Sequence, residues 1–223
     1  TELIQTLSAH PTGIVTVELD ESGIPNFTIG EKSAWDYWEW NSQIEEKVRV
    51  ADAVYFGTLG QRGQSAREGI GKALKVAKKT GILRVLDINL RPPFYGDALI
   101  RESISQCTVL KLSDEELEPV CRACEIDSSI GEQRAMTVLR AQYDLDLVVM
   151  TRGAEGAVLV TEEEVYVQPG IPVRVADTVG AGDSFTASLT MGLLEGGMEY
   201  HKILHDACKV ASGVCSHAGA IPD

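Results

Sequence analysis

The first patterned segment of the chain predicts a β-hairpin. Residues 14–19 (Ile-Val-Thr-Val-Glu-Leu) are mostly β-branched and are typical of an extended strand. Residues 20–25 (Asp-Glu-Ser-Gly-Ile-Pro) have turn chemistry, and residues 26–29 (Asn-Phe-Thr-Ile) return as a second short strand. We therefore expect two antiparallel strands joined by a polar turn near the N-terminus.

After this hairpin, short apolar runs alternate with helical segments. Strands are predicted at residues 53–56, 84–88, 109–111 and 147–150. A helix is predicted at residues 64–79, ended by Gly81, because apolar residues recur there at helical spacing. These residues are Ala66, Ile70, Ala73, Leu74 and Ala77. Apolar strands that alternate with helices are typical of a parallel sheet covered on both faces.

The C-terminal part predicts a second hairpin and two helices. Residues 157–160 and 165–167 are expected to pair around an acidic turn, and one helix should run from Asp183 to Gly196–Gly197. The apolar face of the last helix is predicted to consist of Tyr200, Ile203, Leu204, Ala207, Val210, Ala211 and Val214. The prediction is an α/β protein with a hairpin and aromatic segment at residues 1–45 and a mostly parallel sheet flanked by helices at residues 46–223.

The composition of the chain limits the classes of partner that the protein is expected to bind. The chain has 223 residues, 44% of them hydrophobic, which is enough to form a core without metal or disulfide staples. Its net charge of −13 argues against binding to nucleic acid or to an anionic membrane surface. No apolar run approaches the roughly 20 residues of a membrane span. Five cysteines at irregular spacing favour reduced thiols and a cytoplasmic location.

The segment Asp-Thr-Val-Gly-Ala-Gly-Asp-Ser-Phe at residues 177–185 carries the clearest chemical signal. Gly180, Ala181 and Gly182 stand directly before an amphipathic helix, so its first unpaired N–H groups can approach a ligand. Those amides suit an anion, particularly one whose charge grows during phosphoryl transfer. Asp183 could accept a hydroxyl proton there. From spacing alone, a glycine-rich turn in which Asp183 serves only the helix dipole is equally compatible.

This segment resembles the C-terminal signature of the PfkB, or ribokinase-like, carbohydrate kinases. Other segments are similar to that family in the required order: Thr12–Gly13 to its substrate-covering lid, Asp87–Arg91 to its Asp-x-Asn-x-Arg strand end, Lys111–Glu116 to its Asn-x-x-Glu region, Thr151–Gly156 to its nucleotide-side turn, and Gly219–Pro222 to its ending. The resemblance covers essentially the whole chain. It implies a ribokinase-like fold with a small β-hairpin lid.

The resemblance also implies roles for the residues of the reaction centre. Asp183 would be the catalytic base for a sugar hydroxyl, and the anion hole would be formed by Gly180, Ala181 and Gly182. Asn89 and Arg91 would face the reacting end of the substrate or the transferring phosphate.

Further roles concern the nucleotide and metal ions. ATP would be lined by Thr151, Gly153 and Gly156, with Lys111 and Cys208 nearby. Glu116 would organise magnesium through water. Asp177 and Val179, with backbone near Val214, His217 and Gly219, match positions that hold a monovalent cation such as potassium in some relatives.

Three departures from the family pattern affect these expectations. Ser113 stands where the family usually has asparagine, which weakens the expected contact on the magnesium side. Cys208 replaces an asparagine that some members place near the adenine, so the base would be recognised there by packing. Family members also carry a strand and a Gly-Gly motif well before the lid, where much of the sugar recognition lies. That part is expected to be missing from this sequence, which would then be a fragment.

The function expected from the resemblance is ATP-dependent phosphorylation of a primary hydroxyl on a small sugar. Residues 87–95 and 111–116 are most similar to the fructokinase branch. An enzymatic alternative is 2-keto-3-deoxygluconate kinase, in which Arg91 would meet a carboxylate. The alternative of another class is a non-catalytic relative that binds a sugar or a nucleotide. The presence of Asp183 favours an enzyme, because binding alone does not need the base.

Two side-chain clusters have less certain roles. Trp35, Trp38 and Trp40 could cover a sugar, pack the hairpin down or form a dimer contact. Relatives often dimerise through their lids, so packing and a homodimer interface are favoured over stacking on the substrate. The last helix carries His201, His205 and Cys208 at spacings that a metal could use, but packing and surface positions are favoured.

Overall fold

The computed structural model describes residues 2–19 and 25–221, which form two sheets. The smaller sheet is the predicted hairpin of β1 (Val15–Leu19) and β2 (Pro25–Ile29), with Val17 paired to Phe27 in an antiparallel register. Both strands confirm the prediction from the pattern of β-branched residues. Residues 20–24 of the predicted turn, and Pro222 of the expected C-terminal motif, lie outside the described residues.

The larger sheet has the strand order β3-β4-β5-β6-β7-β8. Its parallel strands are β3 (Ala53–Phe56), β4 (Leu83–Asp87), β5 (Val109–Ser113) and β6 (Leu147–Thr151). The antiparallel strands β7 (Ala157–Val160) and β8 (Val165–Gln168) complete the sheet. The mostly parallel sheet and the second hairpin are therefore confirmed.

Seven α-helices and four short 3₁₀ helices are described. The α-helices are α1 (Ser42–Arg49), α2 (Gln64–Thr80), α3 (Asp97–Gln106), α4 (Asp114–Ala123), α5 (Glu132–Tyr143), α6 (Ala181–Glu195) and α7 (Tyr200–Cys215). The 3₁₀ helices are η1 (Ala34–Asp36), η2 (Leu59–Gln61), η3 (Ser128–Ile130) and η4 (Gly153–Glu155). Gly81 ends α2 as predicted, and α6 begins two residues before the expected Asp183.

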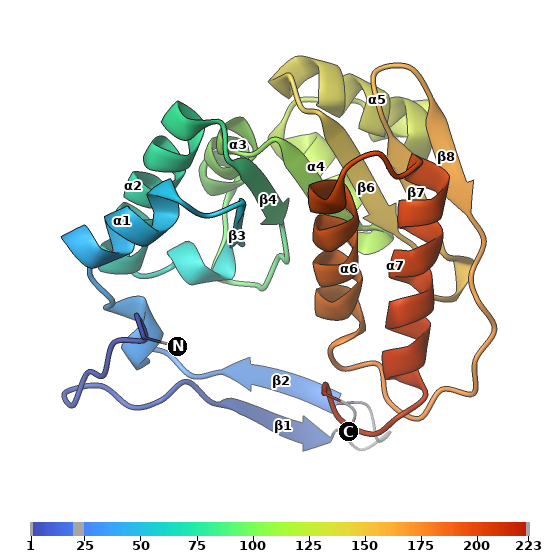
Figure 1. Ribbon diagram of the computed structural model, residues 1–223. Coiled ribbons are helices and arrows are strands. Elements are labelled where there is room, and N and C mark those ends of the chain that lie inside the picture. Colours follow the sequence, from blue (N-terminus) through green and yellow to red (C-terminus); the bar gives the residue numbers. More distant parts are fainter. Residues whose placement is uncertain (1, 20–24, 222–223) are drawn as a thin grey trace.

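Helices cover both faces of the larger sheet (Figure 1). Because successive side chains of a strand point to opposite faces, Leu86 packs in the core beneath α2–α5, whereas Val85 packs in the core beneath α6 and α7. The second core is completed from the helices by Phe185, Leu189, Ile203, Leu204, Ala207 and Cys208. The apolar positions of the central strands are thereby divided between the two cores, and this alternation sets the face on which each polar residue of those strands emerges.

One prediction for the last helix is wrong. Val210 was expected on the buried face of α7, but it is 45% exposed. Ile203 lies seven residues earlier, on nearly the same line of the helix, and is buried. The difference therefore comes from neighbours that no longer cover α7 toward its C-terminal end, and a periodicity calculation cannot detect it.

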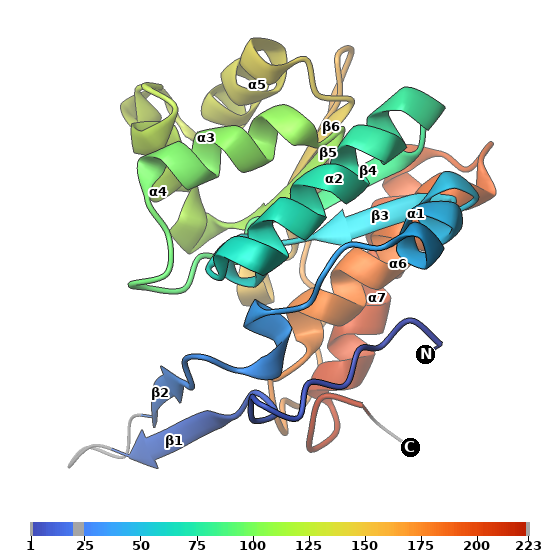
Figure 2. The same ribbon diagram turned by 90° about the vertical axis from the view of Figure 1, so that its left-hand side faces the viewer.

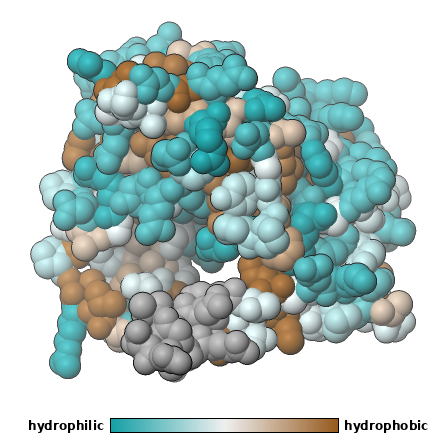
Figure 3. All heavy atoms as spheres, turned by 180° about the vertical axis from the view of Figure 1, so that it is seen from behind, coloured by the Kyte–Doolittle hydropathy of each residue, from teal (hydrophilic) through white to brown (hydrophobic). Residues whose placement is uncertain are grey.

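The hairpin lies beyond the end of the larger sheet at which β4 ends and α6 begins (Figures 1 and 2). Open α/β sheets commonly bind their ligands at this carboxyl end of the parallel strands. The face opposite to Figure 1 is mainly hydrophilic, with smaller apolar patches between the charged residues (Figure 3). None of the described helices is both long and apolar enough to cross a membrane.

Candidate active site

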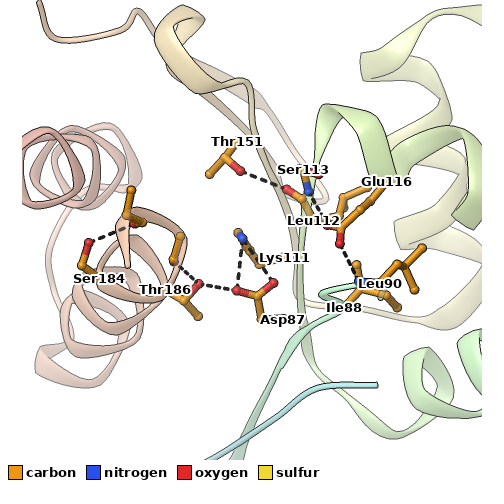
Figure 4. A network of polar contacts seen from close by, with 12 residues as sticks. Asp87, Ile88, Leu90, Lys111, Leu112, Ser113, Glu116, Thr151, Ser184 and Thr186 are labelled. Atoms are coloured by element: carbon orange, nitrogen blue, oxygen red, sulfur yellow. Dashed lines mark hydrogen bonds and ion pairs between the residues drawn. The ribbon is translucent and has the colours of Figure 1, made fainter. Parts of the chain in front are cut away.

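Asp87 and Lys111 form a buried ion pair at the carboxyl ends of two neighbouring strands. They are direct register partners of β4 and β5, and each lies two residues after a valine of the core beneath α6 and α7. Both side chains therefore point toward α6. Lys111 Nζ lies 3.1 Å from Asp87 Oδ2, and the Thr186 hydroxyl donates a 2.9 Å hydrogen bond to the same oxygen (Figure 4). Burial nevertheless raises the pKa of Asp87, outweighing the opposite effect of Lys111 and Thr186.

The predicted glycine turn opens α6 next to this pair. Gly180 is the N-cap residue with φ of 83°, and a Cβ there would lie 2.8 Å from the carbonyl oxygen of Ala220. No side chain caps the helix, and the amides of Gly182 and Asp183 donate to no backbone carbonyl among the described residues. A Cβ on Gly182 would lie 3.5 Å from Lys111 Nζ, so a cation stands beside the unpaired amides. This arrangement suits an anion.

Asp183 occupies the first turn of α6, as predicted, and is exposed. Its partner is Tyr55 of β3, whose register with Val85 places it on the same face of the sheet. Partial burial, followed by the charges of Asp87 and Asp183, raises the pKa of Tyr55, so the Asp183 carboxylate lies close enough to act on its hydroxyl. Tyr55 therefore lies beside the expected base.

A cavity of about 580 Å³ extends from the glycine turn to the predicted nucleotide residues. Thr151, Gly153, Gly156 and Cys208 all line it, together with Ala181 and Gly182. Much of the remaining wall is apolar and is formed by Ile171, Val173, Val175 and Phe185. Burial raises the pKa of the Cys208 thiol to about 11, so this side chain contributes packing without charge. An apolar wall that leads to unpaired amides suits a ligand with an apolar part joined to an anionic part.

Glu116 fixes the loop that carries Asn89 and Arg91. One carboxylate oxygen accepts a 2.8 Å hydrogen bond from the amide of Ser113, and the other accepts a 2.6 Å bond from the amide of Leu90 (Figure 4). The first bond belongs to the capping box of α4. Asn89 follows β4 with φ of 43°, and Arg91 is exposed beyond it. One carboxylate therefore holds both the helix start and the predicted substrate loop.

The donor set fits a loosely held magnesium ion. Among the described residues, no group of three or more His, Cys, Asp or Glu side chains is placed to enclose a metal. Glu116 is close enough to Asp87 for its charge to contribute to the raised pKa of that residue. Magnesium bound with a nucleotide usually keeps several waters and one or two protein carboxylates. Glu116 is a carboxylate of this kind, and an ion held by it through water stays a prediction.

Asp177 joins the glycine turn to the C-terminal segment. Its carboxylate accepts 3.0 Å hydrogen bonds from the amides of Val179 and Gly219. These bonds lower the pKa of Asp177. The amides of Ala176 and Asp177 also donate to the carbonyl oxygen of Cys215. The segment with the expected monovalent-cation residues is thus held together by backbone contacts, and binding of the cation itself stays a prediction.

The tryptophans and the trio of α7 form two further clusters. A Cβ on Gly69 would lie 2.6 Å from the Trp38 ring, so Trp38 packs on α2. Trp35 packs on the guanidinium of Arg62. These contacts support the packing role expected for the tryptophans. On α7, His201 and His205 are exposed whereas Cys208 is buried in the cavity, so the three side chains do not converge.

Comparison with known proteins agrees with this geometry. The family described as "pfkB family carbohydrate kinase" matches residues 1–223 of the chain. The chain belongs to the pfkB family. Its ribokinase-like fold is similar to the crystal structure of an uncharacterized sugar kinase from Pyrococcus horikoshii in complex with ATP. The two are 27% identical in sequence with a TM-score of 0.76, and the match covers 96% of this chain and 67% of the other.

Two curated relatives of this pfkB chain are named as kinases of particular substrates. It is 29% identical to aminoimidazole riboside kinase of Salmonella typhimurium over 90% of its own length, and 25% identical to a fructokinase of Escherichia coli over 85%. These matches cover 62% and 61% of the relatives, so the chain spans less than two thirds of either protein.

The structure adds two residues to the site of this pfkB chain that sequence reasoning did not select. Asp87 was noted only as part of a strand-end motif, yet it links Lys111 to Thr186 of α6. Tyr55 was read only as part of an apolar strand. Because successive side chains of a strand point to opposite faces, Tyr55 faces α6 when its neighbours Val54 and Phe56 pack in the core beneath α2–α5.

Proposed function

We propose that this protein is an ATP-dependent sugar kinase that transfers the γ-phosphoryl group to a primary hydroxyl of a small sugar. The observation that supports the proposal is the continuity of one cavity. It runs from the nucleotide-side residues Thr151 and Gly153 to the unpaired amides at Gly182, where Lys111 adds a positive charge. The bound ATP in the P. horikoshii structure is consistent with a nucleotide in this cavity.

In the proposed reaction, the protein mainly positions groups and stabilises charge. The amides of Gly182 and Asp183, with the ammonium of Lys111, would hold the negative oxygens of the phosphoryl group during transfer. The Asp183 carboxylate, with the Tyr55 hydroxyl beside it, would accept the proton of the attacking hydroxyl. Magnesium, organised through water by Glu116, would supply additional positive charge at the phosphates.

The acceptor is proposed to be a fructose-like sugar that meets Asn89 and Arg91. This choice is supported by the fructokinase name of one relative, and Glu116 holds the loop that carries the two residues. A guanidinium suits either a transferring phosphate or a carboxylate on the acceptor. A panel that includes fructose, an aminoimidazole riboside and 2-keto-3-deoxygluconate distinguishes these acceptors.

The test is ADP release by the full-length protein, followed with a coupled assay across that sugar panel. Asp183→Asn should lower turnover by about three orders of magnitude and change nucleotide affinity by less than about twofold. Asp206→Asn, on the far side of α7, serves as the matched control and should retain activity. Absence of turnover on every sugar, together with unchanged ligand binding by Asp183→Asn, would support a non-catalytic binding protein.

We also propose a homodimer that forms through the hairpin, in the cytoplasm. The hairpin presents exposed Val15 and Val17, and all five cysteines are free. Sedimentation equilibrium tests the assembly: Val17→Asp should convert the dimer to a monomer. A monomeric wild-type protein at micromolar concentration would contradict it.

A further inference from the structure

Arg62 connects the base of the hairpin to the body of the protein. It lies between η2 and α2, and its side chain is only 7% exposed. Its Nε and Nη2 donate hydrogen bonds of 2.7 and 2.9 Å to the two carboxylate oxygens of Asp36 in η1, whose side chain is 6% exposed. Nη2 also donates a 2.6 Å bond to the carbonyl oxygen of Gly30, the residue after β2. This is a bidentate, charge-assisted contact with a defined orientation.

The same guanidinium also contacts the substrate loop. It lies 3.9 Å from the centroid of the Trp35 ring and 4.7 Å from that of Phe94. Nη1 is buried and has no hydrogen-bond partner among the described residues, so the aromatic faces provide its favourable contacts. Phe94 follows Arg91 by three residues in the loop that Glu116 anchors. One side chain therefore touches both the hairpin base and the loop.

Directional bonds add to the packing between these segments. The start of α2 contacts the segment after the hairpin closely, because a Cβ on Gly63 would lie 2.3 Å from the carbonyl oxygen of Asp36, and the Ser65 hydroxyl donates a 3.0 Å hydrogen bond to the carbonyl oxygen of Trp38. Beside this contact, Asp36, Arg62 and Phe94 all line one cavity of about 550 Å³. In this wall Arg62 contacts both Asp36 and Phe94, so its side chain links the hairpin base to the loop.

We propose that Arg62 is a positioning residue that holds the hairpin and the Asn89–Arg91 loop in one arrangement and thereby sets the affinity for the acceptor sugar. The proposal rests on the proposed function. The cavity assigned to the nucleotide is lined by residues of 151–215, with no contribution from the hairpin or α2. Loss of Arg62 should therefore affect the acceptor and leave the nucleotide unaffected.

The principal variant is the double substitution Arg62→Met/Asp36→Leu, which removes both charges and leaves no unpaired buried ion. Its KM for the sugar should rise about tenfold or more, while its Kd for ATP stays within about twofold of wild type. Arg62→Lys keeps the charge without the bidentate geometry and should give an intermediate KM. The control is Arg67→Met in α2, because Arg67 pairs with Glu102 at the surface, where the side chains are 43% and 57% exposed.

Hydrogen–deuterium exchange supplies a readout that does not need turnover. The amides of residues 28–36 and of 90–95 should both exchange faster in Arg62→Lys and in the double variant, and neither should change in Arg67→Met. If exchange rises in only one segment, or if sugar KM and ATP Kd rise together, Arg62 has only a structural role. If wild type turns over no sugar, the proposed function fails, and the exchange result decides the coupling by itself.

Discussion

The ammonium of Lys111 lies 3.1 Å from the carboxylate of Asp87, and the two side chains are 7% and 3% exposed. Adjacent parallel strands place these residues in register, and α6 covers them through Thr186. A charge pair at this depth is stable only while both partners are present. Through Thr186 it also joins the sheet to the helix whose first turn is the proposed anion site.

Removing one partner of this pair should be far more damaging than removing both. Asp87→Asn or Lys111→Met alone is expected to lower the free energy of unfolding by about 3 to 5 kcal/mol, because each leaves a buried charge uncompensated. The double variant should lose much less than the sum, as measured by urea unfolding at pH 7. The exposed pair of Lys202 and Asp206 is the control, and Lys202→Met should cost below about 1 kcal/mol. Additive losses at Asp87 and Lys111 would show that the charges do not compensate each other.

Alanine substitutions at two glycines of the turn should have different effects, one on stability and the other on activity. Gly180→Ala forces φ of 83° on an alanine and directs its methyl group at the Ala220 backbone, so it should destabilise the fold by at least about 1 to 2 kcal/mol. Gly182→Ala meets only an ordinary contact with Lys111 and should match or exceed wild-type stability. Its methyl group nevertheless occupies the proposed anion space, so ADP release should fall. Thermal unfolding measures the effect on stability, and the coupled assay measures the effect on turnover. Full turnover by Gly182→Ala would contradict an anion site at Gly182.

Tyr55→Phe should slow the chemical step without weakening nucleotide binding. The change removes the hydroxyl that lies beside Asp183 and leaves the ring in place. We expect kcat to fall about tenfold, with the KM for ATP within about twofold of wild type. Tyr166→Phe on β8 is the control. A parallel loss in both variants would mean that Tyr55 has no particular role.

Acid stability should depend on Asp177. The amides of Val179 and Gly219 lower its pKa in the folded protein, so its ionised form favours folding above the unfolded pKa of about 4. That contribution should be lost as the pH falls through the lowered folded value. Urea midpoints measured between pH 6 and pH 2 should therefore decline more for wild type than for Asp177→Asn, in which the titrating group is absent. Identical pH profiles would show that the carboxylate does not support the turn.

Several local features could be predicted from the sequence because their causes are local. The β-branched run of β1, the helical spacing of α2 and the glycine that ends it each follow from neighbouring residues. The start of α6 was two residues later in the prediction than in the structure, since Gly180 adopts the N-cap conformation. The grouping of Thr151, Gly153 and Gly156 near the glycine turn followed from the family resemblance, and all three line the cavity with that turn.

Other features depend on contacts between distant segments. Val210 obeys the helical period of α7 and is still exposed, because burial depends on what lies opposite. Asp87 and Thr186 are 99 residues apart, and only the packing of α6 on the sheet brings them together. Tyr55 reaches Asp183, and Arg62 reaches Asp36, for the same reason.

The sequence by itself therefore determined the order of strands and helices, the α/β class and the glycine turn with Asp183 after it, since periodicity and backbone preference act over a few residues. Only the tertiary structure decided which charges are buried together, which tyrosine meets Asp183 and which arginine holds the hairpin. Strand register and helix packing set these partners, and neither is encoded in a short stretch of residues.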